Sequence, residues 1–330
     1  MRVRDLPFLA RRNRSCAGVY LSASTVAVAV AEPQAADRVR AASAPIDDGA
    51  SRGAALKDLV RRLGAERARC VVVPAPEAYQ LMLVERPSVP ASELRDAVRW
   101  RIQEYLDFPA ADAVLDVFPF PDAATRGRSA MVFVVASARG RIEQTVQEAI
   151  DAGVTPVCVD ITELSLRNLV HRIYPSAEHA IALLRLTPAS GVVNVTRGDE
   201  LFLSRRISNV PGELGDQAWG AFKDGLLLQV QRSIDYYESA LSQPPADCLL
   251  VASTHGWQKG IVEHLGAMLP LPVRSLGEVL TDALSIDLVD GSPQPLTAES
   301  LTDAQQETLA AALPALGAAL RATMFAEAAA

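Results

Sequence analysis

The feature that most constrains the fold is a series of expected strands and a helix that occurs twice along the chain. Each copy consists of an apolar hairpin, a third strand, an amphipathic helix and a buried strand. In the first half these elements are expected at residues 17–21, 25–31, 39–43, 54–63 and 70–74. In the second half three strands fall within residues 180–208, the helix surrounds residues 226–241 and a strand covers residues 248–254. This repetition indicates an ancient duplication, and helices that alternate with strands predict a layered α/β fold.

A segment with its own strands and helix interrupts the first copy. Strands are expected at residues 79–87 and 113–120, and the helix between them begins near Ser92 and stops at Pro109. We therefore expect four parts. They are a basic flexible arm at 1–15, a first lobe at 16–76 and 129–175, an inserted subdomain at 77–128 and a second lobe at 176–330.

Composition and charge argue against several classes of protein. The formal net charge of -7 and the pI near 5.3 disfavour a nucleic-acid binder, because phosphate contacts need a basic face. No apolar run approaches the ~20 residues that cross a bilayer, and the first fifteen residues lack the continuous apolar segment of a signal peptide. We therefore expect a cytoplasmic protein, whose basic arm is either solvated or touches anionic lipid.

Cysteine and histidine spacing gives no reason to expect a metal. The four cysteines are far apart and mostly abut apolar runs, which favours buried free thiols, and the four histidines show no ligand spacing. The chain also lacks a G-x-S-x-G elbow, a Walker loop and a dinucleotide fingerprint. We expect no catalytic residue and no metal site.

The expected helix around residues 226–241 has two faces. Apolar residues recur at steps of three and four, which predicts a buried stripe; they are Leu227, Val230, Ile234, Tyr237 and Leu241. A polar group beside the stripe either meets water or lines a site; it consists of Gln229, Arg232, Ser233 and Tyr236. For Arg232, an ion pair with Asp235 or Glu238 is an equally good interpretation.

The duplicated hairpin order resembles the actin-like (ribonuclease H-like) ATPase fold of actin, the heat-shock chaperones, sugar kinases and FtsA. Three segments further resemble PilM-type pilus assembly proteins, and the MshI proteins of MSHA pilus biogenesis in particular. They are RPSVPASELRDAVRWRIQEYLDFPAADAVLDVFPFP at 86–121, LLLQVQRSIDYYES at 226–239 and LPALGAALR at 313–321. The resemblance implies two lobes around a cleft, with a small FtsA/PilM-type α+β subdomain inserted in the first lobe.

The resemblance also implies a partner. Proteins of the PilM type act at the cytoplasmic face of the inner membrane, where they bind the N-terminal cytoplasmic tail of a PilN-like bitopic protein and so associate peripherally with the membrane. In that family the tail lies between the insertion and the first lobe. Residues expected in this region are Arg86, Arg99, Trp100 and Gln103. Trp100 fits an interface or a core equally well.

The phosphate hairpins of the family are altered here. The first PilM hairpin reads like G-x-D-x-G-S, whereas GVYLSAS at 18–24 has Tyr20 at the Asp position and Ser22 at the second Gly. The second reads like D-x-G-A, whereas RLTPA has Arg185 at the Asp and Thr187 at the Gly, followed by Pro188, which has no backbone donor. Mg-dependent hydrolysis needs metal-holding carboxylates at these two positions.

The adenosine side is altered as well. ASTHG at 252–256 has Thr254 and His255 in place of two glycines, and Gln229 stands where the PilM pattern has Glu. We expect these and neighbouring residues to line a degenerate nucleotide cleft: Ser22, Ser24, Thr25, Arg185, Thr187, Ser190, Gln229, Arg232, Ser233, Thr254 and His255.

Our leading hypothesis is therefore a cytoplasmic scaffold of a type IV (MSHA-like) pilus assembly platform, without a cofactor and without enzymatic activity. The alternative is an ATP-binding PilM-like protein with nucleotide-regulated partner binding or weak ATPase activity. A third possibility is a polymerising, FtsA-like filament protein.

Overall fold

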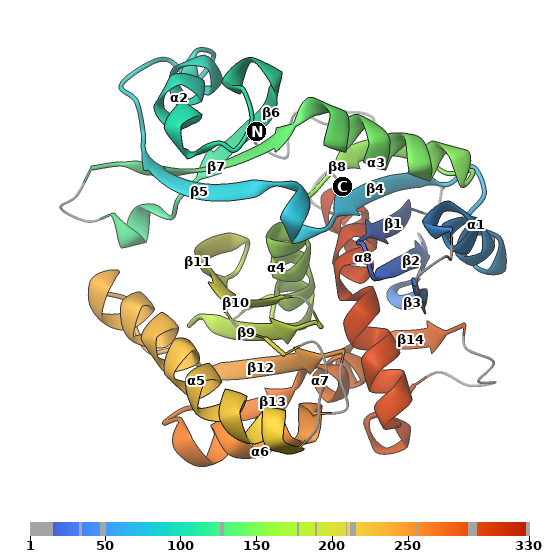
Figure 1. Cartoon of the computed structure of the whole chain (residues 1–330). Coiled ribbons are helices and arrows are strands. Elements are labelled where there is room, and N and C mark those ends of the chain that lie inside the picture. The colour runs from blue at the N-terminus through green and yellow to red at the C-terminus, as the bar shows by residue number, and fades with distance from the viewer. Residues whose placement is uncertain are drawn as a thin grey trace.

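The protein is built from two large β-sheets, helices on both sides of each, and a smaller third sheet (Figure 1). The computed structural model describes residues 16–32, 35–46, 51–125, 129–176, 178–188, 190–208, 210–211, 216–254, 257–289 and 296–327. The basic arm and His255 lie outside these ranges. No helix in the described part of the chain is long and apolar enough to span a membrane.

The first sheet contains six strands in the order β14-β3-β2-β1-β4-β8. In chain order they are β1 (Cys16–Leu21), β2 (Thr25–Glu32), β3 (Ala35–Pro45), β4 (Arg69–Pro74), β8 (Thr155–Val159) and β14 (Ser285–Leu288). The first three strands form an antiparallel meander, and β4 runs parallel to β1. Alternate residues of β1 are buried on opposite faces, because helices cover both sides of the sheet.

The second sheet repeats this topology in the order β11-β10-β9-β12-β13. Its strands are β9 (Ile181–Leu186), β10 (Gly191–Arg197), β11 (Glu200–Ile207), β12 (Cys248–Ser253) and β13 (Val273–Ser275). Again the first three strands are antiparallel and the next is parallel to the first. The matching strand order confirms the expected duplicated α/β architecture.

Helices form three layers around the two sheets (Figure 1). The outer face of the first sheet is covered by α1 (Arg52–Arg62) and α3 (Arg139–Asp151), and that of the second by α5 (Asp216–Asp235) and α6 (Gln258–Met268). The layer between the sheets contains α4 (Thr162–Ile173), α7 (Leu276–Ala283) and α8 (Asp303–Glu327). One apolar core therefore joins both sheets through the central helices.

Small residues let α8 approach its neighbours closely. A Cβ atom at Gly18 of β1 would lie 1.9 Å from the carbonyl oxygen of Ala315, and one at Gly317 would lie 1.9 Å from the carbonyl oxygen of Ser165 in α4. Alanines fill much of the remaining contact surface and are buried; they include Ala312, Ala315, Ala318 and Ala319. The backbone of α8 thus touches both the first sheet and α4 directly.

A three-stranded sheet, ordered β5-β7-β6, forms most of the inserted subdomain. It consists of β5 (Gln80–Glu85), β6 (Ala113–Pro119) and β7 (Met131–Ala138), and α2 (Leu94–Ile102) covers one of its faces. Short 3₁₀ turns lie in and around it at Pro76–Ala78, Gln103–Tyr105, Ala110–Asp112 and Asp122–Ala124, and another precedes α8 at Ala298–Ser300. Phe120 and Phe133 pack into the core beneath α5. The subdomain therefore rests on the second lobe as well as the first.

In two places, an element joins a different sheet from the one that we expected. β7, which we expected in the first lobe, pairs with β5 and β6 and completes the inserted sheet. β14 and α8, which we expected in the second lobe, pack on the first sheet, where β14 pairs with β3. The apolar pattern of a buried strand or helix does not specify which sheet it joins, because that choice depends on long-range pairing.

The expected stripe of α5 is buried as its spacing predicts. Its five apolar residues are at most 9% exposed and pack against the second sheet. The helix does not end regularly, however, since Tyr236–Ala240 forms a π-helical turn. This turn widens the helix beside the inserted sheet.

Candidate functional site

The two hairpins contact each other through Tyr20 and Arg185, the residues that stand where the PilM hairpins have Asp. The Arg185 guanidinium carbon lies 5.4 Å from the centroid of the Tyr20 ring, and Arg185 Nε donates to the carbonyl oxygen of Ala310, 3.3 Å away. Tyr20 is 4% exposed and Arg185 is 3% exposed. A desolvated cation–π contact contributes about 2 kcal/mol. The described ends of β1 and β9 are therefore linked to each other and to α8.

The turn of the first hairpin uses its polar groups internally. The Ser22 hydroxyl accepts from the Thr25 amide and donates to the Thr25 carbonyl, both at 2.9 Å. The Ser24 carbonyl accepts from the Ile46 amide at 2.8 Å. These contacts close a short turn of a common type, in which a serine side chain substitutes for a backbone group. Ser22, Ser24 and Thr25, which we expected to line a cleft, thus also stabilise the turn.

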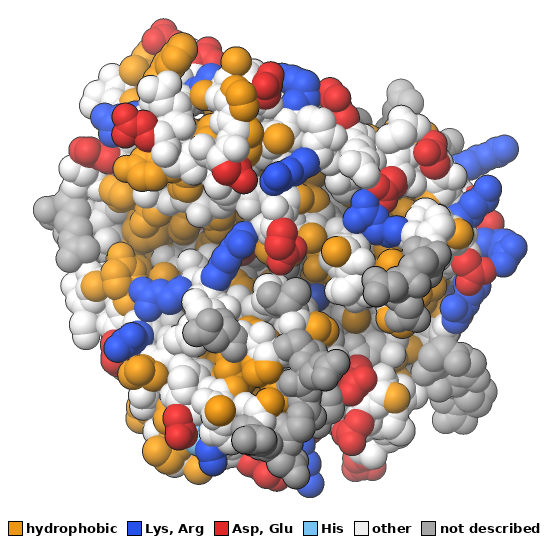
Figure 2. Space-filling view, in the orientation of Figure 1, with side chains coloured by type: hydrophobic (Ala, Val, Ile, Leu, Met, Phe, Trp, Pro, Cys, Tyr) orange, Lys and Arg blue, Asp and Glu red, His pale blue; other side chains and the backbone are white. Residues whose placement is uncertain are grey.

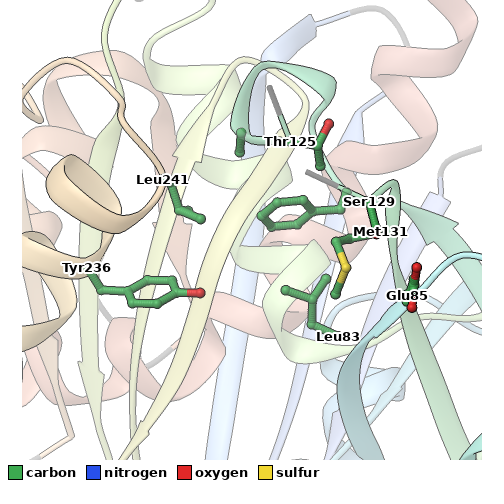
Figure 3. Close-up of a pocket in the computed structure, with 9 residues that line it drawn as sticks. Leu83, Glu85, Thr125, Ser129, Met131, Tyr236 and Leu241 are labelled. Carbon is green, nitrogen blue, oxygen red and sulfur yellow. The ribbon is translucent and has the colours of Figure 1, made fainter. Parts of the chain in front are cut away.

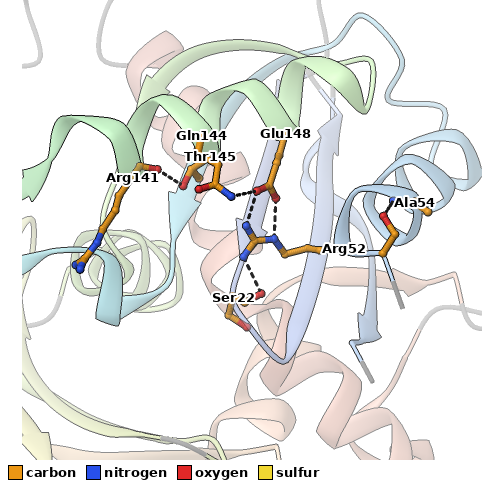
Figure 4. A network of polar contacts seen from close by, with 8 residues as sticks. Ser22, Arg52, Ala54, Arg141, Gln144, Thr145 and Glu148 are labelled. Atoms are coloured by element: carbon orange, nitrogen blue, oxygen red, sulfur yellow. Dashed lines mark hydrogen bonds and ion pairs between the residues drawn. The ribbon is translucent and has the colours of Figure 1, made fainter. Parts of the chain in front are cut away.

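Arg52 links the first turn to helices α1 and α3 (Figure 4). Arg52 of α1 donates from Nε and Nη2 to both carboxylate oxygens of Glu148 in α3, at 2.7 and 2.5 Å, and its Nη1 lies 3.4 Å from the Ser22 carbonyl oxygen. Gln144 adds a hydrogen bond of 3.2 Å to Glu148. The two partners are far apart in the chain, so no local motif reveals this contact. Bidentate geometry fixes both the distance and the orientation of α1 and α3.

The turn of the second hairpin is also closed by its own side chains. The Thr187 amide donates to the Ser190 carbonyl at 2.8 Å, and the Thr187 hydroxyl lies 3.0 Å from that of Ser190. The Thr254 amide donates to the Leu186 carbonyl at 3.1 Å, while the buried Thr254 hydroxyl has no hydrogen-bond partner among the described residues. The fold thus brings Arg185, Thr187, Ser190 and Thr254 to one end of the second sheet.

The polar group of α5 divides into structural and exposed members. The Gln229 side chain accepts from the Ser208 amide at 2.8 Å and so holds the residue that follows β11. Ser233 is fully buried, and its hydroxyl donates to the Gln229 carbonyl at 2.7 Å. Arg232 is exposed and forms no ion pair with any described carboxylate, including Asp235. Arg232 and Tyr236, which is 37% exposed, are thus the members of the group that are available to a ligand.

The four residues expected near a partner differ in availability. Trp100 is 69% exposed, so the core interpretation of this residue is wrong. Gln103 and Arg86 are exposed as well. Arg99 is committed to its own subdomain, because it donates to the carbonyl oxygens of Ala110 and Ala113 at 2.7 and 2.9 Å.

Two buried carboxylates, Asp160 and Glu163, lie at the start of α4, and no motif in the sequence marks them. The Tyr79 hydroxyl donates to Glu163 at 2.5 Å and accepts from the Thr162 amide at 3.0 Å. Burial raises the pKa of Glu163 above its ordinary value, against the opposing effect of the Tyr79 hydrogen bond. Asp160 forms an ion pair of 2.8 Å with Arg321 of α8. Both carboxylates therefore have structural partners that join the lobes and the insertion.

Comparisons with known proteins agree with this architecture. No protein-family model and no curated protein matches the sequence. A chain of the PilM-PilN type IV pilus biogenesis complex is similar in structure, with a TM-score of 0.67 and 20% identity over 93% of this chain and 98% of that one. A Bacteroides thetaiotaomicron protein of actin-like ATPase fold and unknown function gives 0.51 and 8% identity over 85% and 95%.

The structure is less similar to the cytoplasmic domain of EpsL, an inner-membrane component of the type II secretion system of Vibrio cholerae. The TM-score is 0.49 and the identity is 16%. This likeness covers 79% of this chain and 85% of that one. At these identities the likenesses concern the fold. Together with the repeated strand order, the likenesses to the PilM-PilN chain and to the Bacteroides thetaiotaomicron protein show that the chain has the actin-like ATPase fold.

Proposed function

We propose that this protein is a cytoplasmic scaffold of a type IV, MSHA-like pilus assembly platform, which binds the cytoplasmic tail of a PilN-like inner-membrane protein. The likeness to the PilM-PilN complex supports this proposal, because it extends along 93% of the chain. The sequence resemblance to PilM and MshI proteins supports it independently. Association with the membrane would then come from the partner.

The observation that carries the proposal is an exposed aromatic surface on the inserted subdomain. Trp100 is 69% exposed and Tyr105 is 67% exposed, and Gln103 lies exposed between them. Large aromatic side chains are enriched at protein interfaces, where they supply most of the binding energy. α2 covers the inserted sheet without using Trp100, so this side chain is free to anchor a peptide.

We further propose that the nucleotide cleft is degenerate. The groups present do not fit Mg·ATP. The two positions that would hold a metal or its waters are a phenol ring and a guanidinium, Tyr20 and Arg185, which are buried against each other. Pro188 removes a backbone donor from the second turn, and the Thr187 and Ser190 side chains bind each other.

Calorimetric titration with the N-terminal cytoplasmic peptide of a PilN-like partner tests the scaffold function. We expect Trp100→Ala to weaken binding at least about tenfold, as for an interface hot spot. Met268→Ala is the matched control, because Met268 is 56% exposed but lies on α6 of the other lobe. The proposal fails if the wild-type chain does not bind the peptide or if the two variants behave alike.

Thermal unfolding with ATP and Mg separates this function from the ATP-binding alternative. A ligand at 100 times its Kd stabilises the folded state by about 2.7 kcal/mol. We expect no stabilisation here. An increase in Tm that disappears in Arg232→Ala would favour a nucleotide-regulated protein instead.

A further inference from the structure

A groove separates the inserted sheet from the C-terminal end of α5. We call it the overhang groove; its volume is about 340 Å³, and it is lined by Leu83, Glu85, Phe120, Met131, Tyr236 and Leu241, among others. Figure 3 shows the Tyr236 side chain extending from the helix toward Leu83 and Met131. The groove is therefore formed jointly by two parts of the chain that are distant in sequence.

Strand alternation explains why apolar side chains reach the surface here. Leu81 of β5 packs into the core of the second lobe, and Leu83 points to the same side of the sheet two residues later. Leu83 lies past the edge of that core and is 38% exposed. Figure 2 shows hydrophobic side chains gathered in this hollow beneath the inserted subdomain. The sheet thus presents apolar side chains to the groove.

The opposite wall is a helical irregularity. Tyr236 begins the π-helical turn that ends α5, and it is 37% exposed. π-Helical turns interrupt α-helices rarely and occur frequently at functional sites. Here the turn brings Tyr236 and Leu241 to the same groove. A regular continuation of α5 would rotate these two side chains apart.

Positive charge borders the groove without compensation. The Arg205 guanidinium lies 5.5 Å from the centroid of the Tyr236 ring, and Arg232 precedes Tyr236 by four residues on the same face of α5. Neither arginine forms an ion pair within the described part of the chain. Glu85 on the opposite wall has a positive partner of its own, since Arg101 Nη1 lies 3.8 Å from its carboxylate. Beside the groove, Arg205 and Arg232 therefore carry positive charge that no described carboxylate pairs with.

We propose that the overhang groove docks a segment of a partner protein in which an apolar side chain is flanked by aspartate or glutamate. The volume is in the lower part of the roughly 300–1,000 Å³ range of ligand pockets, which suits one or two large side chains. Arg205 and Arg232 supply the complementary charge for the flanking carboxylate. This surface lies on the face of the inserted sheet opposite to α2, so it goes beyond the proposed tail site at Trp100.

Selection from a phage library of random twelve-residue peptides on the intact chain tests this proposal. We expect enriched peptides to combine a large apolar residue with Asp or Glu within about four positions. For a synthetic enriched peptide, fluorescence anisotropy should show binding weakened at least about tenfold in Leu83→Glu and in Arg232→Glu. Trp100→Ala should bind like the wild type, which separates failure of this proposal from failure of the tail site.

The matched control is Lys57→Glu, which makes the same charge reversal on an exposed position of α1. We expect it to change the affinity by less than about twofold. If Leu83→Glu fails to fold, the exposed Arg232→Glu variant carries the test. Absence of enrichment, a basic consensus, or equal affinities in all variants would overturn the proposal. Self-association that Leu83→Glu abolishes would assign the groove to a second copy of the chain and would overturn it too.

Discussion

Gly317→Ala tests the close crossing of α4 and α8 at the centre of the molecule. The added Cβ would lie 1.9 Å from the Ser165 carbonyl oxygen, about 1.5 Å short of the 3.4 Å at which ordinary contact begins. Inserting a methyl group into a packed core costs about 1–3 kcal/mol. The clash is between the backbones of two packed helices, which cannot rearrange as a flexible side chain can. We therefore expect a loss of stability at the upper end of this range, about 3 kcal/mol.

Urea unfolding followed by circular dichroism measures this loss. The matched control is Gly220→Ala in α5, where an added Cβ meets no atom within 4 Å. Replacing an exposed helical glycine by alanine stabilises by about 0.5–1 kcal/mol, so the two substitutions should have opposite signs. If Gly317→Ala were as stable as the wild type, α8 would not cross α4 at this distance, and the described central layer would be wrong.

Three further measurements test other contacts. Arg52→Ala should lower the free energy of unfolding by about 1 kcal/mol, because Arg52 is partly buried and bidentate, whereas Arg61→Ala, at an exposed pair, should have almost no effect; equal effects in urea unfolding would contradict this. Burial raises the pKa of Glu163, so the folded state binds that proton more tightly than the unfolded state and loses stability as the pH rises from about 4.5 through the raised pKa. Glu163→Gln should therefore gain stability relative to the wild type over this pH range. Parallel curves of unfolding free energy against pH for the two proteins would refute this prediction. Burial also raises the pKa of Cys16 to about 11 and that of Cys70 to about 12, so Ellman's reagent at pH 8 should label neither before unfolding; rapid labelling of either thiol in the folded chain would show that it is accessible.

The sequence predicts those parts of the fold that depend on local pattern. The hairpins, the α5 stripe and the helix of the insertion follow from spacing of two or of three to four residues, which burial on one face imposes. The position of β7 in the inserted sheet, the pairing of β14 with β3 and the passage of α8 between the sheets depend on contacts between distant segments. Such contacts leave little trace in a single sequence.

The candidate site divides in the same way. Tyr20 and Arg185 stand out in the sequence because they replace expected carboxylates, but only the structure shows that the two side chains pack on each other. The overhang groove had no sequence signal, because Leu83 and Tyr236 belong to separate elements whose patterns each predict an ordinary strand and helix. The π-helical turn, which brings Tyr236 to the groove, depends on packing that propensity does not encode.

The affinity of the PilN-like tail peptide, measured by calorimetry with and without saturating ATP and Mg, tests the proposed scaffold with a degenerate cleft most directly. Coupling between two sites is reciprocal, so a nucleotide that regulates the tail must change its Kd, typically by about 5–150-fold. We expect the peptide to bind with the same Kd under both conditions. A tail affinity that changes at least about fivefold on addition of ATP and Mg would contradict the account and establish a working nucleotide site.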